Sequence, residues 1–429
     1  MPSPGQVSPE VLEIITTRAV SEIISREEFV RLLQSGKKLR LKMGFDPSRP
    51  DIHLGHVVGL RKLRQLQELG HQVILIVGDW TAQIGDPSGQ SATRPILTHA
   101  QVMENAESYL RQFFKVVDQT RAQVVYQSEW FGKFNLANVL ELTGRFTVNQ
   151  FLQRADFAKR FADQRPIAIT ELLYPLLQAY DSLEIEADVE FGGTDQKFNL
   201  LVGRELQEKM GKSPQQCFMM PILVGTDGVQ KMSKSLGNYV AVDEAPVDMY
   251  GKLMSVSDEQ IIAYFEYLTD VPAAELAALA KDLAGNAVNP MESKKRLAWD
   301  ITNQFHDREA ADAAQAHFER VVQDGGLPSE MREMDITAYG GQVTLFGPPE
   351  AMDGELSGSP TNMLIHLLVA ADLAKSNSEA KRLLEQGAIE QIKQNGNSVK
   401  LTVGSPVSSL EAGDVIRRGK RQFVRLKLS

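Results

Sequence analysis

Cysteine is almost absent, since Cys217 is the only one in 429 residues. A disulfide framework within the chain is therefore impossible, and a zinc site built from cysteines is excluded. No apolar run approaches the roughly 20 residues that a membrane-spanning helix needs. The first residues, MPSPGQVSPEVLEII, have neither the basic start and apolar stretch of a secretory signal nor the arginines of a transit peptide. These absences favour a cytoplasmic protein without a membrane partner.

Positive charge is also scarce, because 46 Lys and Arg stand against 55 Asp and Glu, and the net charge is −9. Such a balance is unusual for a nucleic-acid-binding protein. Residues 361–429 are the exception, with 11 Lys and Arg against 6 Asp and Glu, a net charge of +5, which leaves −14 for the rest. A basic end on an acidic body predicts that this end has an anionic partner of its own.

The length indicates more than one domain, and residues 39–77 suggest the fold of the first. They contain a short strand that ends at Gly44, a helix with apolar residues at helical spacing, and the run VILIV, which is typical of a central parallel strand. A mostly helical stretch is expected from about Thr98 to Asp181, followed by a strand near EADVEFGGTDQ. The fold class predicted is α/β, with a Rossmann-like parallel-sheet catalytic domain.

The second half of the chain is expected to add three further parts. Residues 248–322 show an Ala-rich helical pattern, and Gly, Pro and acidic residues then predominate in a linker. Near the end, Ser376 with Glu379 predicts a capped helix start, and Asn395-Gly396 predicts a hairpin. The predicted domains are a catalytic domain with a helical insertion (1–240), an α-helical domain (241–325), a linker (326–360) and a small α+β module (361–429).

HLGH, residues 53–56, lies where a strand leads into a helix. Free backbone N–H groups and the positive end of the helix dipole bind phosphate at such a place, and His53 and His56 share one helix face. A helix cap with a surface histidine would produce the same pattern. A metal-binding pair is a further alternative, but no third ligand is evident and no bound metal is expected.

KMSKS, residues 231–235, follows a predicted strand and turn. Lys231 and Lys234 in a polar loop suit a pyrophosphate that must be gripped during a reaction and then released. A solvated loop would be the simpler interpretation of this segment alone. HLGH near the start of an α/β unit and KMSKS at its end form a much more specific pair. Together they resemble the signature of class I aminoacyl-tRNA synthetases.

The segments GFDPSRPDIHLGH, IGDPSG, YPLLQAYD and GGTDQ, in this order, resemble the tyrosyl-tRNA synthetase family. The resemblance covers most of the chain. It implies that the helical domain contacts the anticodon and that the last module is a small RNA-binding domain. It also implies a homodimer that binds ATP, L-tyrosine and tRNA(Tyr), with Mg²⁺ accompanying ATP.

The resemblance also assigns roles to residues. The bound tyrosine would be held by Asp86, Tyr174, Gln178, Asp181 and Gln196. Asp181 would accept a hydrogen bond from the phenolic hydroxyl. The ATP site would consist of Gly44, Asp46, His53, His56, Gly193, Asp195, Lys231 and Lys234. The catalytic groups at the phosphates would be His53, His56, Lys231, Lys234 and Arg94. The basic module would contact RNA through Lys381, Arg382, Arg417, Arg418, Lys420 and Arg421.

Two positions depart from the family pattern. Lys42 stands where a tyrosine often shares recognition of the substrate hydroxyl, and Gln90 stands where a lysine often follows the GDPSG loop. The implied reaction is attack of the tyrosine carboxylate on the α-phosphorus of ATP, followed by transfer to the 3′ end of tRNA. The alternatives are a tryptophanyl-tRNA synthetase and an inactive synthetase-like RNA-binding protein.

Overall fold

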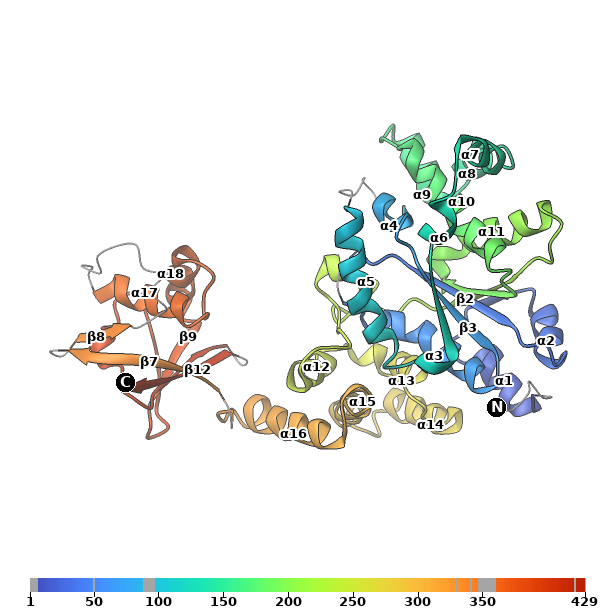
Figure 1. Cartoon of the computed structure of the whole chain (residues 1–429). Helices are drawn as coiled ribbons and strands as arrows, with labels where there is room; N and C mark the ends of the chain where they lie inside the picture. Colours follow the sequence, from blue (N-terminus) through green and yellow to red (C-terminus); the bar gives the residue numbers. More distant parts are fainter. Residues whose placement is uncertain are drawn as a thin grey trace. The chain divides into compact units, whose positions relative to one another are not determined.

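The computed structural model describes residues 7–48, 51–87, 97–328, 331–339, 342–345, 360–419 and 422–428. The chain forms two compact units, Met1–Ala311 and Asp312–Ser429 (Figure 1). Within the described ranges, no helix is both long enough and apolar enough to cross a membrane.

The first unit is built on a six-stranded sheet with the order β1-β6-β5-β2-β3-β4. The strands are β1 (Glu22–Ile24), β2 (Arg40–Phe45), β3 (Gln72–Val77), β4 (Ala122–Tyr126), β5 (Val189–Gly193) and β6 (Gln216–Met220). All neighbours pair in parallel except β1, which runs antiparallel to β6. The chain moves outward from β2 to β4 and then returns to β5 on the other side of β2. Ligands of such sheets bind beyond the carboxyl ends of the strands at this reversal point.

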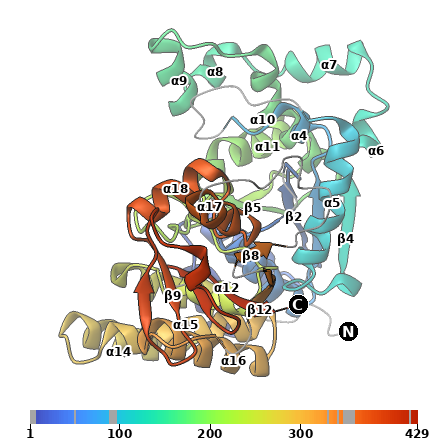
Figure 2. The same ribbon diagram turned by 90° about the vertical axis from the view of Figure 1, so that its left-hand side faces the viewer.

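Helices surround the sheet, and a further group of helices lies beyond one end of it. They are α1 (Pro9–Thr17), α2 (Arg26–Gln34), α3 (Leu54–Glu68), α4 (Thr81–Ile84), α5 (His99–Phe113), α6 (Ser128–Phe131), α7 (Leu136–Thr143), α8 (Val148–Leu152), α9 (Ala155–Ala162), α10 (Ile169–Glu184) and α11 (Lys197–Lys209). Both views show α7, α8 and α9 together at the top of this unit (Figures 1 and 2). The centre of the sheet is fully buried, since every residue of Val73–Val77 in β3 is 0% exposed. This burial explains the continuous apolar run of β3.

Five helices follow the sheet. They are α12 (Pro246–Leu253), α13 (Ile261–Leu268), α14 (Ala273–Ala284), α15 (Pro290–Phe305) and α16 (Arg308–Phe318). Arg18, just after α1, donates to the carbonyl oxygens of Glu266, Val271 and Thr269, at 2.9, 2.6 and 2.7 Å. These bonds satisfy carbonyl groups at the end of α13 and attach the helical region to the catalytic sheet region.

The second unit contains another six-stranded sheet, with the order β10-β9-β11-β12-β7-β8, and two helices. Its elements are β7 (Arg332–Tyr339), β8 (Gln342–Leu345), α17 (Pro360–Ala370), α18 (Asn377–Glu385), β9 (Ile389–Ile392), β10 (Ser398–Lys400), β11 (Val415–Arg418) and β12 (Gln422–Leu428). The hairpin predicted at Asn395-Gly396 connects the antiparallel strands β9 and β10, and Gly396 has a φ of 83°. Such a positive φ favours glycine.

Two stretches differ from the sequence predictions. The mostly helical stretch after Thr98 contains strand β4, which was missed. The predicted linker 326–360 contains β7 and β8, and β7 pairs in parallel with β12. Met334 and Ile336 of β7 are 9% and 2% exposed, because alternate residues of the strand face the core of this unit. The neighbouring Gly and Pro residues obscured this alternation.

Candidate active site

The carboxyl ends of β2 and β5 lie at the reversal point of the sheet and carry several predicted site residues. Gly44 belongs to β2, and no heavy atom lies within 4 Å of the position that a Cβ would occupy there. Gly193 ends β5, and a Cβ there would lie 2.7 Å from Asp195 Oδ1. Asp195 follows in a short 3₁₀ turn. Gly44 thus leaves the end of β2 open, whereas Gly193 leaves room for the side chain of Asp195.

Asp46 follows β2 and receives two hydrogen bonds. The Tyr174 hydroxyl donates to Asp46 Oδ2 at 2.9 Å, and Thr81 Oγ1 donates to Oδ1 at 2.7 Å. Burial, together with the carboxylates of Asp46 and Asp86, raises the pKa of Tyr174 well above its usual value. Tyr174 therefore remains a protonated hydrogen-bond donor at neutral pH.

Asp181 lies on the same face of α10 as Tyr174 and Gln178, and it is 2% exposed. Gln127 Nε2 donates to Asp181 Oδ2 at 2.8 Å, and Trp130 Nε1 donates to Oδ1 at 3.2 Å. Burial raises the pKa of Asp181 to about 7, although the charge of Lys42 and the bond from Gln127 oppose the shift. The two neutral donors orient this carboxyl group.

Lys42 of β2 contacts the helix α10 that carries Tyr174, Gln178 and Asp181. Its ammonium group donates to Ser182 Oγ at 2.6 Å and to the Gln178 carbonyl oxygen at 2.7 Å, and it lies 2.8 Å from Glu190 Oε1. Both charged side chains are buried, at 0% and 1% exposure. Lys42 therefore joins β2, α10 and β5.

Two glutamines and one asparagine form a connected amide group. Asn199 Nδ2 donates to Gln178 Oε1 at 3.0 Å and to Gln196 Oε1 at 3.1 Å. Gln196 Nε2 in turn donates to Asp86 Oδ2 at 2.6 Å. Residues from α10, α11, the turn after β5 and the segment after α4 thus meet at one place.

The two histidines of HLGH start α3 in a defined tautomer. His53 Nδ1 accepts from the Gly55 N–H, and His56 Nδ1 accepts from the His53 N–H, both at 3.2 Å. Burial holds the pKa of His53 well below its usual range and lowers that of His56 to about 4, and nearby positive charges add to both shifts. Each neutral ring therefore carries its hydrogen on Nε2 and can donate it. Gly55 is required here, since a Cβ would lie 2.9 Å from the His53 ring.

KMSKS lies beside HLGH. Met232 Cβ lies 3.8 Å from the position that a Cβ of Gly55 would occupy. The Leu54 N–H donates at 3.0 Å to the carbonyl oxygen of Val240, shortly after KMSKS, and His53 forms an isolated β-bridge with Ala241. Lys231 Nζ lies 2.9 Å from Asp195 Oδ2. The two sequence motifs, about 180 residues apart in the chain, thus form one site together with the end of β5.

Tyr109 of α5 connects the two motifs. Lys234 Nζ donates to its hydroxyl at 3.0 Å and lies 4.7 Å from its ring centroid. The His56 and Tyr109 rings meet edge to face with centroids 6.2 Å apart, and Phe45 stacks on Tyr109 at 5.4 Å. Tyr109 thereby holds the end of the Lys234 side chain near His56.

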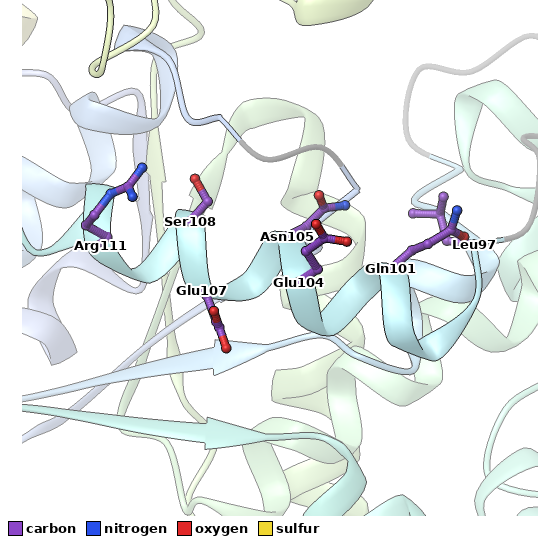
Figure 3. A pocket seen from close by; sticks show the side chains of 7 residues that line it. All are labelled: Leu97, Gln101, Glu104, Asn105, Glu107, Ser108 and Arg111. Carbon is purple, nitrogen blue, oxygen red and sulfur yellow. The ribbon is translucent and has the colours of Figure 1, made fainter.

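A surface groove of about 710 Å³ runs along α5 (Figure 3). It is lined by Leu97, Gln101, Glu104, Asn105, Glu107, Ser108 and Arg111. Among the residues that the structure describes, none of the predicted site residues lines it. Asn105 connects it to the segment after β2, since its Nδ2 donates to the Pro47 carbonyl oxygen at 2.9 Å.

Comparison with known proteins gives one consistent answer. The profile of the class I tRNA synthetases (W and Y) matches residues 34–323. The tyrosine–tRNA ligase of Dehalococcoides mccartyi strain 195 is 55% identical over 96% of this chain and 97% of its own. That of Thermotoga maritima is 45% identical over 98% of both chains. The chain belongs to the tyrosyl-tRNA synthetase family.

Solved structures agree with this membership. The tyrosyl-tRNA synthetase of Archaeoglobus fulgidus, solved in complex with L-tyrosine, is 26% identical and has a TM-score of 0.59, covering 71% of this chain and 99% of its own. The tryptophanyl alternative is set aside, since the near-full-length relatives are tyrosine–tRNA ligases. The synthetase is therefore a class I enzyme with the predicted α/β fold.

Most of the predicted residues of the synthetase meet in this one site. Arg94 and the substituted position Gln90 lie outside the described residues, as do Lys420 and Arg421 of the basic module. Among the described residues, no group of three or more His, Cys, Asp and Glu is arranged to hold a metal ion.

Sequence reasoning missed the residues that support the site. They are Thr81, Tyr109, Gln127, Trp130, Arg154, Ser182, Glu190 and Asn199. Gln127 directly follows β4 and could have been found if QVVY had been recognised as a parallel strand. Asn199 had no sequence signal, because its importance depends on partners in other elements.

The predicted RNA-contacting cations of the second unit fall into two groups. Lys381 and Arg382 of α18 are exposed. Arg418 instead donates to the Leu373 carbonyl oxygen at 2.8 Å and to Glu379 Oε1 at 3.0 Å, and Arg417 pairs with Glu390. These bonds make Arg417 and Arg418 part of the internal structure of the module.

Proposed function

We propose that the tyrosine substrate lies beside α10 at the carboxyl ends of β2 and β5. Asp86, Tyr174 and Gln178 hold its amino group, Gln196 interacts with its carboxylate, and Asp181 accepts a hydrogen bond from its hydroxyl. Tyr174 is hydrogen-bonded to Asp46, and Gln178 and Gln196 are both hydrogen-bonded to Asn199. Asp86 accepts from Gln196, and these connections support the assignment.

ATP occupies the neighbouring part of the site. Gly44 and Asp46 lie on the nucleotide side, Gly193 and Asp195 bind the ribose, and Arg94 serves the pyrophosphate. Mg²⁺ enters with ATP, held largely by phosphate and water oxygens, because a small hard cation keeps such ligands. The open space at the Cβ position of Gly44 supports the close approach of a nucleotide.

Adenylate formation requires positioning and charge stabilisation. The tyrosine carboxylate is already a nucleophile, so it attacks the α-phosphorus without a general base. His53 and His56 donate from Nε2 to phosphate oxygens, and Lys231 and Lys234 stabilise charge on the departing pyrophosphate. The meeting of HLGH and KMSKS at one edge of the sheet is the observation that carries this mechanism.

The deciding experiment is exchange of labelled pyrophosphate into ATP by the full-length protein. Exchange should depend on tyrosine and should be negligible with tryptophan. Absence of tyrosine-dependent exchange would leave only the alternative of an inactive, RNA-binding synthetase-like protein.

The second step uses the remaining domains. The helical region contacts the anticodon arm of tRNA(Tyr). The basic module binds RNA phosphates through Lys381, Arg382, Arg417, Arg418, Lys420 and Arg421. The exposure of Lys381 and Arg382 supports this role. We also propose a cytoplasmic location, where tRNA charging takes place.

The synthetase is further proposed to act as a homodimer. Helices α7 to α9 and the start of α10 carry large apolar side chains in water-exposed positions. They are Leu136 (72% exposed), Leu140 (62%), Val148 (59%), Phe161 (65%) and Ile169 (79%). So many exposed apolar side chains in one segment are typical of a surface that is covered by a partner. A second copy of the chain is the proposed partner.

A further inference from the structure

The side-chain amide of Asn199 stands at the centre of a hydrogen-bond chain beneath the tyrosine site. Arg154, which precedes α9, donates from a terminal guanidinium nitrogen to Asn199 Oδ1 at 3.2 Å. Asn199 donates from Nδ2 to Oε1 of both Gln178 and Gln196. Asn199 is 0% exposed and Arg154 is 7% exposed, so water does not compete for these bonds.

The two glutamines extend the chain to carboxylates. Gln178 Nε2 donates to Glu190 Oε1 at 3.0 Å, and Gln196 Nε2 donates to Asp86 Oδ2 at 2.6 Å. Both branches therefore end on groups that can only accept when ionised.

The ends of the chain determine its direction. An arginine can only donate, so Asn199 must turn its oxygen toward Arg154 and its NH₂ group toward the glutamines. The carboxylates require the NH₂ groups of the glutamines, which leaves each glutamine oxygen to face Asn199. Every bond runs from the cation toward the carboxylates, and a flip of any amide would place two donors or two acceptors together. Aligned bonds of this kind polarise and strengthen one another.

We propose that Asn199, oriented by Arg154, is a positioning residue that fixes the amide orientation of Gln178 and Gln196 for recognition of the tyrosine zwitterion. This inference rests on the proposed roles of the two glutamines. A carbonyl oxygen has two lone pairs, so Gln178 Oε1 can accept from the substrate ammonium while it accepts from Asn199. Gln196 Nε2 is a donor that suits the substrate carboxylate. Through its bonds to both glutamines, Asn199 thus fixes the oxygen of Gln178 toward the substrate ammonium and the NH₂ group of Gln196 toward the substrate carboxylate.

Three contacts hold Arg154 in place for this task. Its guanidinium group pairs with Asp156 at 2.7 Å and lies over the rings of Phe157 and Phe198, at 5.0 and 5.7 Å from their centroids. Phe198 is the neighbour of Asn199 on α11. The same guanidinium group is therefore fixed by both α9 and α11.

The test replaces Asn199 by aspartate, which has the same shape but can only accept. In Asn199→Asp both glutamines lose their donor, and the orientation that they share is no longer enforced. We expect the KM for tyrosine in pyrophosphate exchange to rise roughly 10- to 100-fold, since leaving a buried polar group without its partner costs about 1–3 kcal/mol. The KM for ATP should stay within about twofold. Preference for tyrosine over phenylalanine should not change, because Asp181 lies at the other end of the substrate.

Gln207→Glu is the matched control. Gln207 is a buried amide on the same helix α11, and it donates to the carbonyl oxygens of Ser182 and Ala187 without contacting either glutamine side chain. It should lower the melting temperature as Asn199→Asp does and leave the KM for tyrosine unchanged. A purely structural role of Asn199 would make the two variants alike, and that result would overturn the proposal.

Arg154 provides a second test if Asn199→Asp does not fold. Arg154→Met should raise the KM for tyrosine because Asn199 loses the donor that orients it. Arg154→Lys keeps a cationic donor, so its KM for tyrosine should be close to the wild-type value. Equal KM values in both Arg154 variants and the wild type would contradict the proposal. Failure of the proposed function itself is distinguishable, because the wild type would then show no tyrosine-dependent exchange.

Discussion

Lys42 and Glu190 form a buried ion pair of 2.8 Å beneath the helix that carries Tyr174, Gln178 and Asp181. The pair explains the departure from the family pattern at position 42. Lys42 stands where a tyrosine often shares recognition of the substrate hydroxyl, but its ammonium group is directed to α10 and β5. We interpret Lys42 as a support of the site.

Replacing Lys42 by methionine should destabilise the synthetase by about 3–5 kcal/mol, because the Glu190 charge would remain buried without its partner. Urea denaturation of the full chain measures this loss. The double variant Lys42→Met/Glu190→Gln removes both charges and should regain at least half of the stability. Equal stability of the single and double variants would contradict the ion-pair interpretation.

Asp181→Ala should abolish most of the discrimination between tyrosine and phenylalanine. A site built to bind a hydroxyl rejects the analogue without it by roughly 10⁴–10⁵-fold. This range was established on tyrosyl-tRNA synthetases themselves and is not calculated from the present geometry. The ratio of kcat/KM for the two amino acids measures the effect. Asp414→Ala, which removes a buried aspartate from the second unit, is the control and should leave the ratio unchanged. Full discrimination by Asp181→Ala would assign hydroxyl recognition to another group.

Lys234→Ala should slow adenylate formation by on the order of 100-fold and leave the dissociation constant of tyrosine nearly unchanged, because its charge acts on the departing pyrophosphate. Single-turnover kinetics separate the two quantities. Lys212→Ala, a surface lysine paired with Glu186, controls for loss of charge. Weaker tyrosine binding with an unchanged rate constant would be inconsistent with this role.

Removal of the basic module should spare pyrophosphate exchange and impair aminoacylation of tRNA. The truncation point must lie before residue 361, where the sequence placed the start of the module. β7 belongs to the module, and Val321 packs with Ile392, Val415 and Phe423. A chain that ends near residue 318 should therefore remain monodisperse, whereas one that ends at residue 360 leaves β7 without β12. Aminoacylation across a salt series measures the loss, since phosphate contacts weaken steeply with salt. Unchanged charging at sub-saturating tRNA would exclude RNA binding by the module.

The proposed dimer should dissociate when charge is placed on its apolar segment. Leu136→Asp/Leu140→Asp should shift the mass measured by light scattering from about twice 47.6 kDa toward 47.6 kDa. Val399→Asp, at a half-exposed apolar position of the second unit, should not shift it. A wild-type mass near 47.6 kDa at micromolar concentration would refute the dimer.

The sequence was most informative where local pattern and chemistry coincide. The apolar run of β3, the helix that begins at HLGH and the hairpin at Asn395-Gly396 follow from spacing and turn chemistry alone. Strand β4 and the linker strands escaped because their pairing partners lie far away in the sequence. A strand acquires its stability from its neighbours, so a short segment between helices or glycines gives little local indication.

The site divides in the same way. The residues proposed to touch substrates lie in recognisable motifs, whereas Asn199, Gln127 and Glu190 act through partners that only the fold brings near. The direction of hydrogen bonding from Arg154 to Glu190 and Asp86 depends on residues from six separate segments and could not be obtained from any one of them.

The parallel pairing of β7 with β12 has a consequence for synthesis of the protein. β7 is among the first parts of the second unit to leave the ribosome, whereas its parallel partner β12 follows about 90 residues later. The sheet of the second unit therefore cannot close until β12 has emerged. The first unit, in contrast, has all its strands by Met220 and can fold while the chain is still growing. The first unit is thus expected to fold before the sheet of the second unit can close.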